Sequence, residues 1–220
     1  MQTVPEKPIK KSPALGVALI ASLAGAFGAL LLFSWLAREV IEGELRNFDL
    51  QVRMSIYGCA TPGLTAAMRV ITILGSFWFL LILFALIGAF FFSIRWRRAV
   101  GWLALSTAGA VALDDALKNL FHRARPTPLF IPLPETYSFP SGHALVSFCF
   151  YMVLAGLLTA RMRGVRARVL IWIAASLVVG AIGFSRIYLG VHWPSDVIAG
   201  YAAGAVWVSG LVSLDRWRKR

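Results

Sequence analysis

Residues 139–160 read FPSGHALVSFCFYMVLAGLLTA, a short polar turn that runs directly into an apolar stretch. No charged residue occurs between Ala144 and Ala160. A helix needs roughly 20 apolar residues to cross the hydrocarbon of a bilayer, so this stretch is close to the length of a membrane span. The turn places Ser141 and His143 where such a helix would meet the membrane surface.

Similar apolar runs occur along the rest of the chain. Of its 220 residues, 59% are hydrophobic and 15% are charged, whereas about a quarter of the residues in a soluble domain are charged. The first run is longer than the core of a signal peptide and no small-x-small cleavage site follows it, so we expect a retained span. The sequence therefore predicts an all-α, polytopic membrane protein that forms one domain over residues 1–220. The six predicted transmembrane helices cover residues 14–36, 75–93, 100–120, 144–160, 169–185 and 197–214.

Basic residues predict how these spans are oriented. Lys and Arg cluster beside alternate span ends, in residues 7–11, 95–98, 161–168 and 216–220. Because Lys and Arg are concentrated in cytoplasmic loops, this face should be cytoplasmic, with residues 1–13 as a cytoplasmic tail and both termini inside. Topology then explains the net charge of +12, and we expect no nucleic-acid partner.

The long segment 37–74 falls on the opposite, extracytoplasmic face and mixes charged with apolar residues. Apolar residues at positions 41, 45, 48 and 52 keep to one face of a helix. This spacing predicts an amphipathic helix that lies in the membrane interface between the first two spans. The alternative for the same segment is a solvated loop.

Three polar clusters interrupt the apolar runs: KNLFHRARP (118–126), FPSGHA (139–144) and SRIYLGVHWPSD (185–196). The predicted topology places all three on the extracytoplasmic face, at the ends of four spans. Ionisable groups at such positions are costly. Each basic residue alone could be an interfacial anchor or a helix cap, but their convergence favours a functional site.

Together the clusters hold the groups that bind a phosphate. Ser141 can cap a helix, Gly142 lets the backbone approach a ligand, and free N–H groups at a helix start attract anions. Lys118, Arg125 and Arg186 would neutralise a phosphoryl group and its transition state. A supporting role is expected for one of the two carboxylates that precede Lys118 by four and three residues, Asp114 and Asp115.

Two histidines permit a division of chemical roles. His192 lies four residues before Asp196, and a carboxylate bonded to one ring nitrogen leaves the other nitrogen free to attack phosphorus. His143 would donate a proton to the departing lipid oxygen and later activate water. No spacing typical of metal ligands, such as CxxC or HExxH, occurs in the sequence, and we expect neither a metal nor another cofactor.

With these residues identified, the chain resembles the type 2 phosphatidic acid phosphatase superfamily. KNLFHRARP matches its K-x6-RP signature, FPSGHA contains its PSGH signature, and SRIYLGVHWPSD matches SR-x5-H-x3-D. The resemblance implies His192 as a nucleophile that forms a phosphohistidine, Asp196 as its partner and His143 as the general acid. It implies no metal. It also implies phosphate binding by Lys118, Arg125, Ser141, Gly142 and Arg186.

The expected substrate is a membrane lipid phosphate in the bacterial cytoplasmic (inner) membrane, at an active site facing the periplasm or cell exterior. We expect undecaprenyl pyrophosphate, because recycling of a lipid carrier requires an outward-facing phosphatase. Phosphatidylglycerophosphate, phosphatidic acid and lipid A 1-phosphate are alternatives, as is transfer of the phosphate from one lipid to another. A transporter or scramblase that only binds lipid headgroups would not need two histidines. No obligate protein partner is evident.

Overall fold

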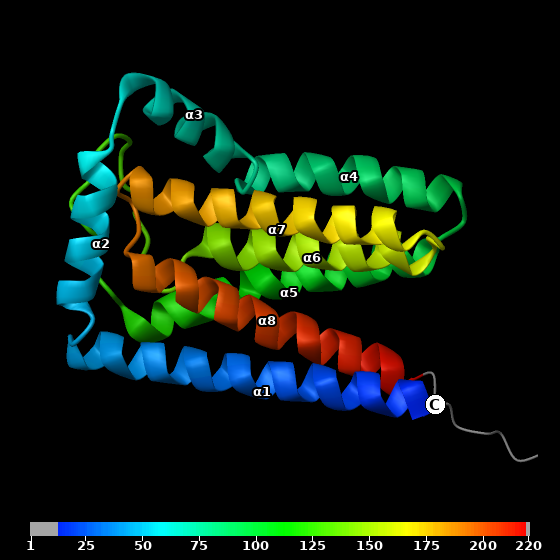
Figure 1. The fold of residues 1–220 in the computed structure, drawn as a ribbon. Helices are drawn as coiled ribbons and strands as arrows, with labels where there is room; N and C mark the ends of the chain where they lie inside the picture. Colours follow the sequence, from blue (N-terminus) through cyan, green and yellow to red (C-terminus); the bar gives the residue numbers. More distant parts are fainter. Residues whose placement is uncertain (1–12, 219–220) are drawn as a thin grey trace, which may run out of the picture.

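The computed structural model of the protein describes the backbone of residues 13–218 and the side chains of residues 20–218. Within that range the chain forms helices and no strand, as the sequence predicts (Figure 1). Residues 1–12 and 219–220, which hold most of the predicted tail and part of two basic groups, lie outside the described residues. The helices are α1 (Pro13–Glu42), α2 (Arg46–Gly58), α3 (Pro62–Ile73), α4 (Phe77–Ser93), α5 (Arg97–Phe121), α6 (Gly142–Ala160), α7 (Val165–Tyr188) and α8 (Pro194–Trp217).

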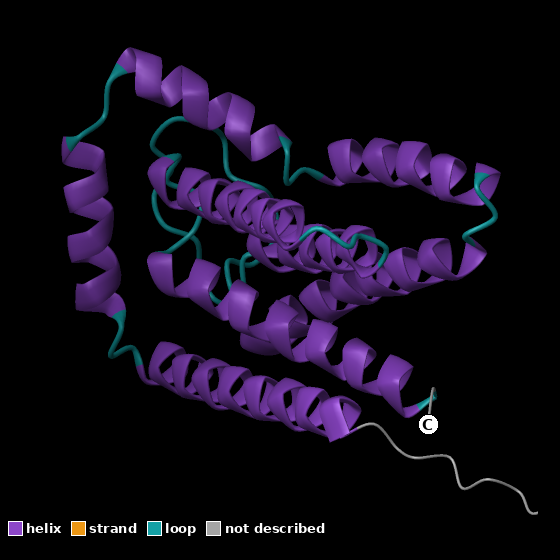
Figure 2. Cartoon of the chain, turned by 45° about the vertical axis from the view of Figure 1, so that its right-hand side comes forward, coloured by secondary structure: helices purple, strands orange, loops and turns teal. Residues whose placement is uncertain are grey.

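Helices α1 and α4 to α8 run roughly side by side, and α2 crosses one end of this bundle (Figures 1 and 2). By length and composition, α1, α5, α6, α7 and α8 can each cross a membrane. The 17-residue α4 reaches the length of a span only together with α3, from which it is bent by 50°. Ser76 caps the start of α4 at this break, where its hydroxyl accepts a hydrogen bond from the Phe79 N–H. The described chain thus has five candidate spans, or six if the bent pair is one span.

The segment 37–74 differs from its prediction. Residues 37–42 continue α1, and Gly43 ends that helix with a φ of +80°, a conformation that glycine adopts without strain. Ile41 therefore lies on α1, Leu45 lies in the turn before α2, and only Phe48 and Val52 share α2, so the predicted apolar face over these four positions is wrong. A helix does follow α1, but α2 buries Asp49 and Arg53 against the bundle and exposes Phe48.

Helix α6 lies at the centre of the bundle, where it packs against α5, α7 and α8. Its residues Leu145, Cys149 and Phe150 are completely buried. They belong to two apolar clusters whose other fully or nearly buried members are Leu80, Leu103, Ala110 and Ala203. The apolar run that predicts a membrane span is therefore also the core of the fold.

Small residues bring α8 against the beginning of α6. A Cβ atom at Gly200 would lie 2.7 Å from the carbonyl oxygen of Ser141, and one at Gly204 would lie 2.9 Å from the Phe148 ring. Only glycine permits this approach. The Ser141 N–H donates to the Asp196 carbonyl at 3.0 Å. The polar turn before α6 and the start of α8 are thus held together.

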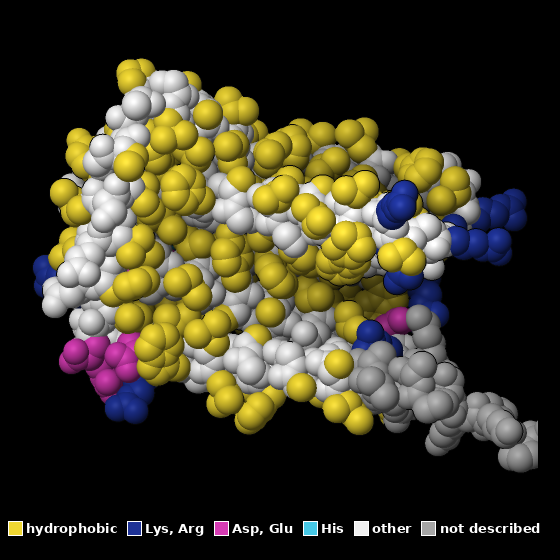
Figure 3. All heavy atoms as spheres, in the orientation of Figure 1, with side chains coloured by type: hydrophobic (Ala, Val, Ile, Leu, Met, Phe, Trp, Pro, Cys, Tyr) yellow, Lys and Arg dark blue, Asp and Glu magenta, His cyan; other side chains and the backbone are white. Residues whose placement is uncertain are grey.

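The outer surface separates apolar from basic regions. Large apolar side chains are exposed along α1, α4 and α7, and yellow side chains cover much of the visible flank (Figure 3). Lys and Arg gather at the end of the bundle where Figure 1 places the α4–α5 and α6–α7 turns (Figure 3). A helix bundle that is apolar on its outside is suited to a lipid environment.

Candidate active site

A cavity of about 580 Å³ lies between α4, α5 and α6 and reaches the loops before α6 and α8. Polar groups from three helices and two loops converge at one end of it. These are Asp114 and Lys118 of α5, Arg125 and Thr136, His143 of α6, Arg186 of α7 and His192. The structure therefore brings together side chains from all three polar clusters of the sequence.

One face of α5 lines the cavity from Ala104 to Lys118. Ala104, Ala108, Val111, Asp114 and Lys118 are spaced three or four residues apart, so they lie above one another on the helix. The lining changes from apolar to charged along this stripe. Opposite the apolar part, α4 contributes Phe77, Leu80, Leu81 and Phe84.

Lys118 is paired with Asp114 within α5. Its Nζ lies 2.5 Å from the Asp114 Oδ2, and both side chains are largely buried. Asp115 is exposed, so Asp114 is the carboxylate that supports Lys118. A Cβ atom at Gly142 would lie 2.5 Å from that Oδ2 and 2.9 Å from Nζ. Because Gly142 has no side chain, the Asp114–Lys118 ion pair can lie directly beside the N-terminus of α6.

Ser141 precedes α6 in an extended conformation and its residue is completely buried. Its hydroxyl does not cap the helix, which differs from the sequence expectation. The Oγ instead has no protein partner. The hydroxyl and the first N–H groups of α6 are therefore donors that an anion in the cavity can use.

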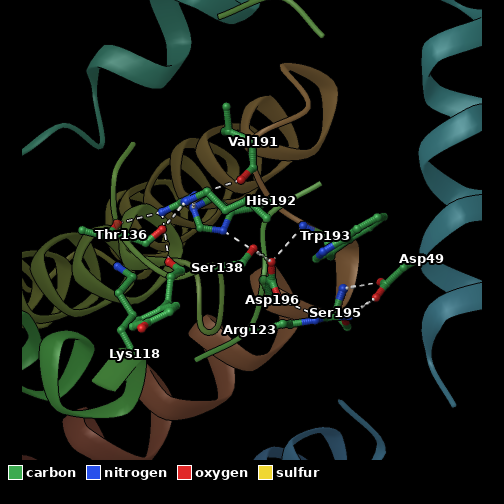
Figure 4. A network of polar contacts seen from close by, with 12 residues as sticks. Asp49, Lys118, Arg123, Thr136, Ser138, Val191, His192, Trp193, Ser195 and Asp196 are labelled. Atoms are coloured by element: carbon green, nitrogen blue, oxygen red, sulfur yellow. Dashed lines mark hydrogen bonds and ion pairs between the residues drawn. The ribbon is translucent and has the colours of Figure 1, made fainter. Parts of the chain in front are cut away.

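His192 lies two residues before the first residue of α8, and its side chain is 2% exposed. Its Nε2 lies 3.1 Å from the Arg125 Nη1. A guanidinium only donates hydrogen bonds, so Nε2 must be the acceptor and the ring proton belongs on Nδ1. That Nδ1 lies 3.5 Å from the Asp196 Oδ2 (Figure 4). The arrangement selects the tautomer whose Nε2 carries the lone pair.

Burial also keeps the His192 ring neutral. Desolvation lowers the pKa of His192 well below the ordinary histidine value, and the charges of Arg186, Arg125 and Lys118 lower it further. The lone pair on Nε2 is therefore available at neutral pH, as nucleophilic attack requires.

Asp196 is held by several donors at the first turn of α8. Its Oδ2 accepts from the Ser138 hydroxyl at 2.5 Å and from the Trp193 N–H at 2.9 Å, while Oδ1 accepts from the Arg123 Nη1 at 2.5 Å (Figure 4). Pro194 at the start of the helix and an acidic residue two positions later are typical of helix beginnings. The carboxylate that faces His192 is thus part of the helix cap.

The other two cations differ in how much of their donor capacity is free. Arg125 donates to the carbonyls of Thr136, Tyr137 and Val191, besides contacting His192. Arg186 is almost completely buried and donates from Nη1 to the Thr72 hydroxyl of α3 at 2.8 Å. Its Nε has no protein partner. Arg186 thus has free donor capacity, whereas Arg125 would have to exchange an existing bond for a phosphate oxygen.

Unpartnered polar atoms are concentrated in this cavity. Among the side chains that the structure describes, five buried nitrogen or oxygen atoms lack a hydrogen-bond partner, and four of them belong to cavity residues or their immediate neighbour. Buried polar atoms are normally bonded, so this concentration indicates a polar ligand. Three of these atoms, the Asp114 Oδ1, the Ser141 Oγ and the Arg186 Nε, have no polar partner of any kind, whereas the fourth, the His192 Nδ1, faces the Asp196 Oδ2 at 3.5 Å.

Sequence reasoning missed part of the site. Asp49, Arg123 and Ser195 form a buried network behind Asp196. In the sequence, Asp49 and Arg123 each lie among other charged residues, and nothing in their spacing shows that the two side chains meet. Across residues 20–218 no three His, Cys, Asp or Glu side chains are grouped as a metal site would require.

Comparison with known proteins identifies the family. The PAP2 superfamily profile matches residues 99–220. Phosphatidylglycerophosphatase B of Bacillus subtilis is 32% identical over 179 residues, covering 79% of this chain and 86% of that protein. Undecaprenyl-diphosphatase of Sulfolobus acidocaldarius is 36% identical over 123 residues, covering 53% and 55% of the two chains.

A solved structure agrees with the fold over nearly the whole chain. The crystal structure of a transmembrane PAP2-type phosphatidylglycerolphosphate phosphatase from Bacillus subtilis has a TM-score of 0.83 and 28% identity, and covers 89% of this chain and 98% of that one. These similarities confirm the family that the three polar clusters indicate. The chain therefore belongs to the PAP2 superfamily, and it is a membrane-spanning phosphatase that acts on phosphoric esters of lipids.

Proposed function

We propose that the protein removes a terminal phosphate from a membrane lipid through a phosphohistidine on His192. The observation that carries this proposal is the geometry around Nε2. The nitrogen has its lone pair available in a cavity lined by Lys118, Arg125 and Arg186. The free Ser141 hydroxyl and Arg186 Nε lie beside the same space. Preorganised donors and cations of this kind stabilise the charge of a phosphoryl transition state.

The proposed reaction has two displacements at phosphorus. In the first, the His192 Nε2 forms a bond to phosphorus while the bond to the lipid oxygen breaks, and His143 gives that oxygen its proton. In the second, His143 accepts a proton from water, whose oxygen attacks phosphorus and breaks the bond to His192. Arg125 moves its contact from Nε2 to a phosphate oxygen at the start of this cycle. Asp196 stabilises the ring as it gains positive charge.

The apolar part of the cavity supports a position for the lipid tail. The facing sides of α4 and α5 continue the cavity away from the charged end, with Phe77 and Phe84 on one wall and Ala104 and Ala108 on the other. An apolar chain in this groove leaves the phosphate at His192 while the remainder of the tail stays in the bilayer.

The distribution of charge supports the orientation of the protein. The basic residues gather at the end of the bundle where α4 and α6 end, whereas His143 lies at the beginning of α6. With the basic end in the cytoplasm, the catalytic end faces the periplasm or cell exterior.

The substrate that we propose first is phosphatidylglycerophosphate. The relative with that activity in its name aligns with 79% of this chain. Undecaprenyl diphosphate, the substrate expected from the sequence, is the second candidate, because a relative named for it is 36% identical over 123 residues that cover about half of this chain. A lipid-to-lipid phosphotransferase would use the same phosphohistidine.

Release of inorganic phosphate from purified protein in liposomes tests this proposal. The panel contains phosphatidylglycerophosphate, undecaprenyl diphosphate, phosphatidic acid and lipid A 1-phosphate, each assayed with EDTA and with vanadate. We expect hydrolysis that EDTA leaves unchanged and vanadate inhibits, fastest for phosphatidylglycerophosphate. Activity that disappears with EDTA and returns with magnesium would contradict the mechanism. Phosphate recovered mainly on an added acceptor lipid would favour transfer over hydrolysis.

Filling the groove should affect substrates with long tails. In Ala108→Phe, the new ring occupies the cavity between α4 and α5, so we expect the KM for a long-chain lipid phosphate to rise roughly 10-fold or more. A short-chain, water-soluble analogue should retain its kcat and KM, because the charged end is unchanged. The matched control is Ala112→Phe, at an exposed α5 position outside the cavity lining. Equal effects on both substrates would place the tail elsewhere.

A further inference from the structure

Helix α2 places a buried carboxylate at the catalytic end of the bundle. Asp49 is completely buried although it lies on a helix that crosses the outside of the bundle. Its Oδ1 accepts from the Ser195 N–H at 2.9 Å, and its Oδ2 accepts from the Ser195 hydroxyl at 2.6 Å and from the Arg123 Nη2 at 2.7 Å. Every one of these contacts is to a residue beside Asp196 or to a residue that binds Asp196.

Arg123 lies between two carboxylates. Its Nη2 is bonded to Asp49, while its Nη1 is bonded to the Asp196 Oδ1 at 2.5 Å and to the Ser195 hydroxyl at 2.8 Å (Figure 4). The planar, rigid fork of a guanidinium suits this arrangement, and a lysine ammonium would not reproduce it. The position of Arg123 therefore depends on Asp49, and the position of the Asp196 carboxylate depends on Arg123.

The same network controls how much negative charge Asp196 presents to His192. The Asp196 Oδ1 faces Arg123, and its Oδ2 faces the His192 Nδ1 at 3.5 Å. Arg123 partly neutralises Asp196, and Asp49 in turn takes up part of the charge of Arg123. The network thus affects both the orientation of the ring and the stability of its charged form.

We propose that Asp49 and Arg123 are positioning residues, through which α2 holds the carboxylate that orients His192. This proposal rests on the proposed role of His192 as nucleophile. Neither residue lines the cavity, so both act through Asp196 and not by contact with the lipid. A misplacement of about 1 Å at a reacting group can lower a rate about 100-fold.

The acid limb of the pH profile of kcat/KM reports the pKa of the group that must be unprotonated in the free enzyme, here His192. A simple loss of packing would lower the rate without moving this limb. The groups that face His192 in wild type are Lys118 from α5, His143 from α6, Arg186 from α7, Asp196 from α8 and Arg125 from the preceding loop. Arg123→Gln leaves Asp196 with its full charge beside the ring, so we expect the limb to move to higher pH. Asp49→Asn removes a negative charge that Arg123 shares with Asp196. Arg123 then neutralises Asp196 more fully, so the charged His192 ring is less stabilised and the limb should move to lower pH.

The double variant Arg123→Gln/Asp49→Asn should give a limb between those of the single variants, because the two removed charges oppose each other. In all three variants we expect kcat to fall roughly 10- to 100-fold, with little change in KM. Arg123→Lys keeps the charge but loses the fork, so its limb should stay near that of wild type while kcat falls. This variant, with Asp49→Asn, decides the proposal if the glutamine variants do not fold.

Arg38→Gln and Glu42→Gln are the matched charge controls, since they alter an exposed ion pair on α1 and should leave the limb in place. The proposal is overturned if Arg123→Gln and Asp49→Asn keep the wild-type limb, or if these two single variants shift it in the same direction. Near-normal turnover in His192→Ala would instead contradict the proposed function itself. An inactive His192→Ala together with unshifted network variants would reject only the network.

Discussion

His192→Ala is expected to lower turnover of the lipid phosphate by at least about 10⁴-fold. Without the imidazole there is no group to form the bond to phosphorus, and residual rate can come only from the cations and donors around the phosphate. Binding of the lipid should persist, because Lys118, Arg186 and Ser141 remain in place. The measurements are phosphate release and equilibrium binding of a lipid phosphate in the same detergent preparation.

The phosphoenzyme provides a direct test of the same variant. Wild-type protein that is quenched in alkali during turnover of a ³²P-labelled lipid should carry label that is lost in acid, as a phosphohistidine does. His192→Ala should carry none. His122→Ala is the matched control, because His122 is an exposed histidine on the same side of the protein whose ring packs against Tyr137. Labelling or near-normal turnover in His192→Ala would remove this residue from the nucleophile role.

The second large effect is expected at His143. In His143→Ala, the departing lipid oxygen no longer receives a proton, so kcat should fall about 10²- to 10⁴-fold. The first step with 4-nitrophenyl phosphate should be much less affected, because nitrophenolate leaves without a proton. Dephosphorylation still needs a base to activate water, so the labelled phosphoenzyme should accumulate with this substrate. A burst of nitrophenol close to one per protein molecule is the measurement.

This test separates a proton donor from a residue that merely shapes the cavity. His143 lies beside the α3–α4 turn, where a Cβ atom at Gly75 would approach its ring to 3.2 Å, so its loss also changes local packing. A packing effect should slow the lipid and the aryl phosphate equally and give no burst. That result would reject the acid–base role while leaving the nucleophile in place.

Much of the arrangement was predictable from local features of the chain. The all-α fold and the approximate positions of the apolar helices follow from hydropathy. A span in lipid must form its backbone hydrogen bonds internally, and a helix does so. The clustering of Lys118, His143, Arg186 and His192 at one cavity follows from their positions at the ends of these helices. The pairing of Lys118 with one nearby carboxylate follows from a spacing of four residues on a helix.

The environment of α2 was not predictable in the same way. Periodicity correctly indicated a helix in this region, but it could not show which side of that helix faces the protein. An apolar stripe is read as the buried side, whereas here Asp49 and Arg53 are buried and Phe48 is exposed. The polar face of an amphipathic helix can contact either lipid headgroups or the polar end of the bundle. Composition alone therefore does not show whether the polar or the apolar face of α2 packs against the protein.

The sequence by itself determined that cations, a serine and two histidines would meet at the ends of membrane helices, and that their chemistry suits a lipid phosphate. Hydropathy and short spacings are properties of the chain in its solvent, so they can be read before folding. The tertiary structure decided which nitrogen of His192 carries the lone pair, through Arg125, and what holds Asp196, through Arg123 and Asp49. The Asp49–Ser195 contact joins residues 146 positions apart. Such hydrogen bonds exist only once packing has excluded water from both partners, and they leave no regular pattern in the sequence.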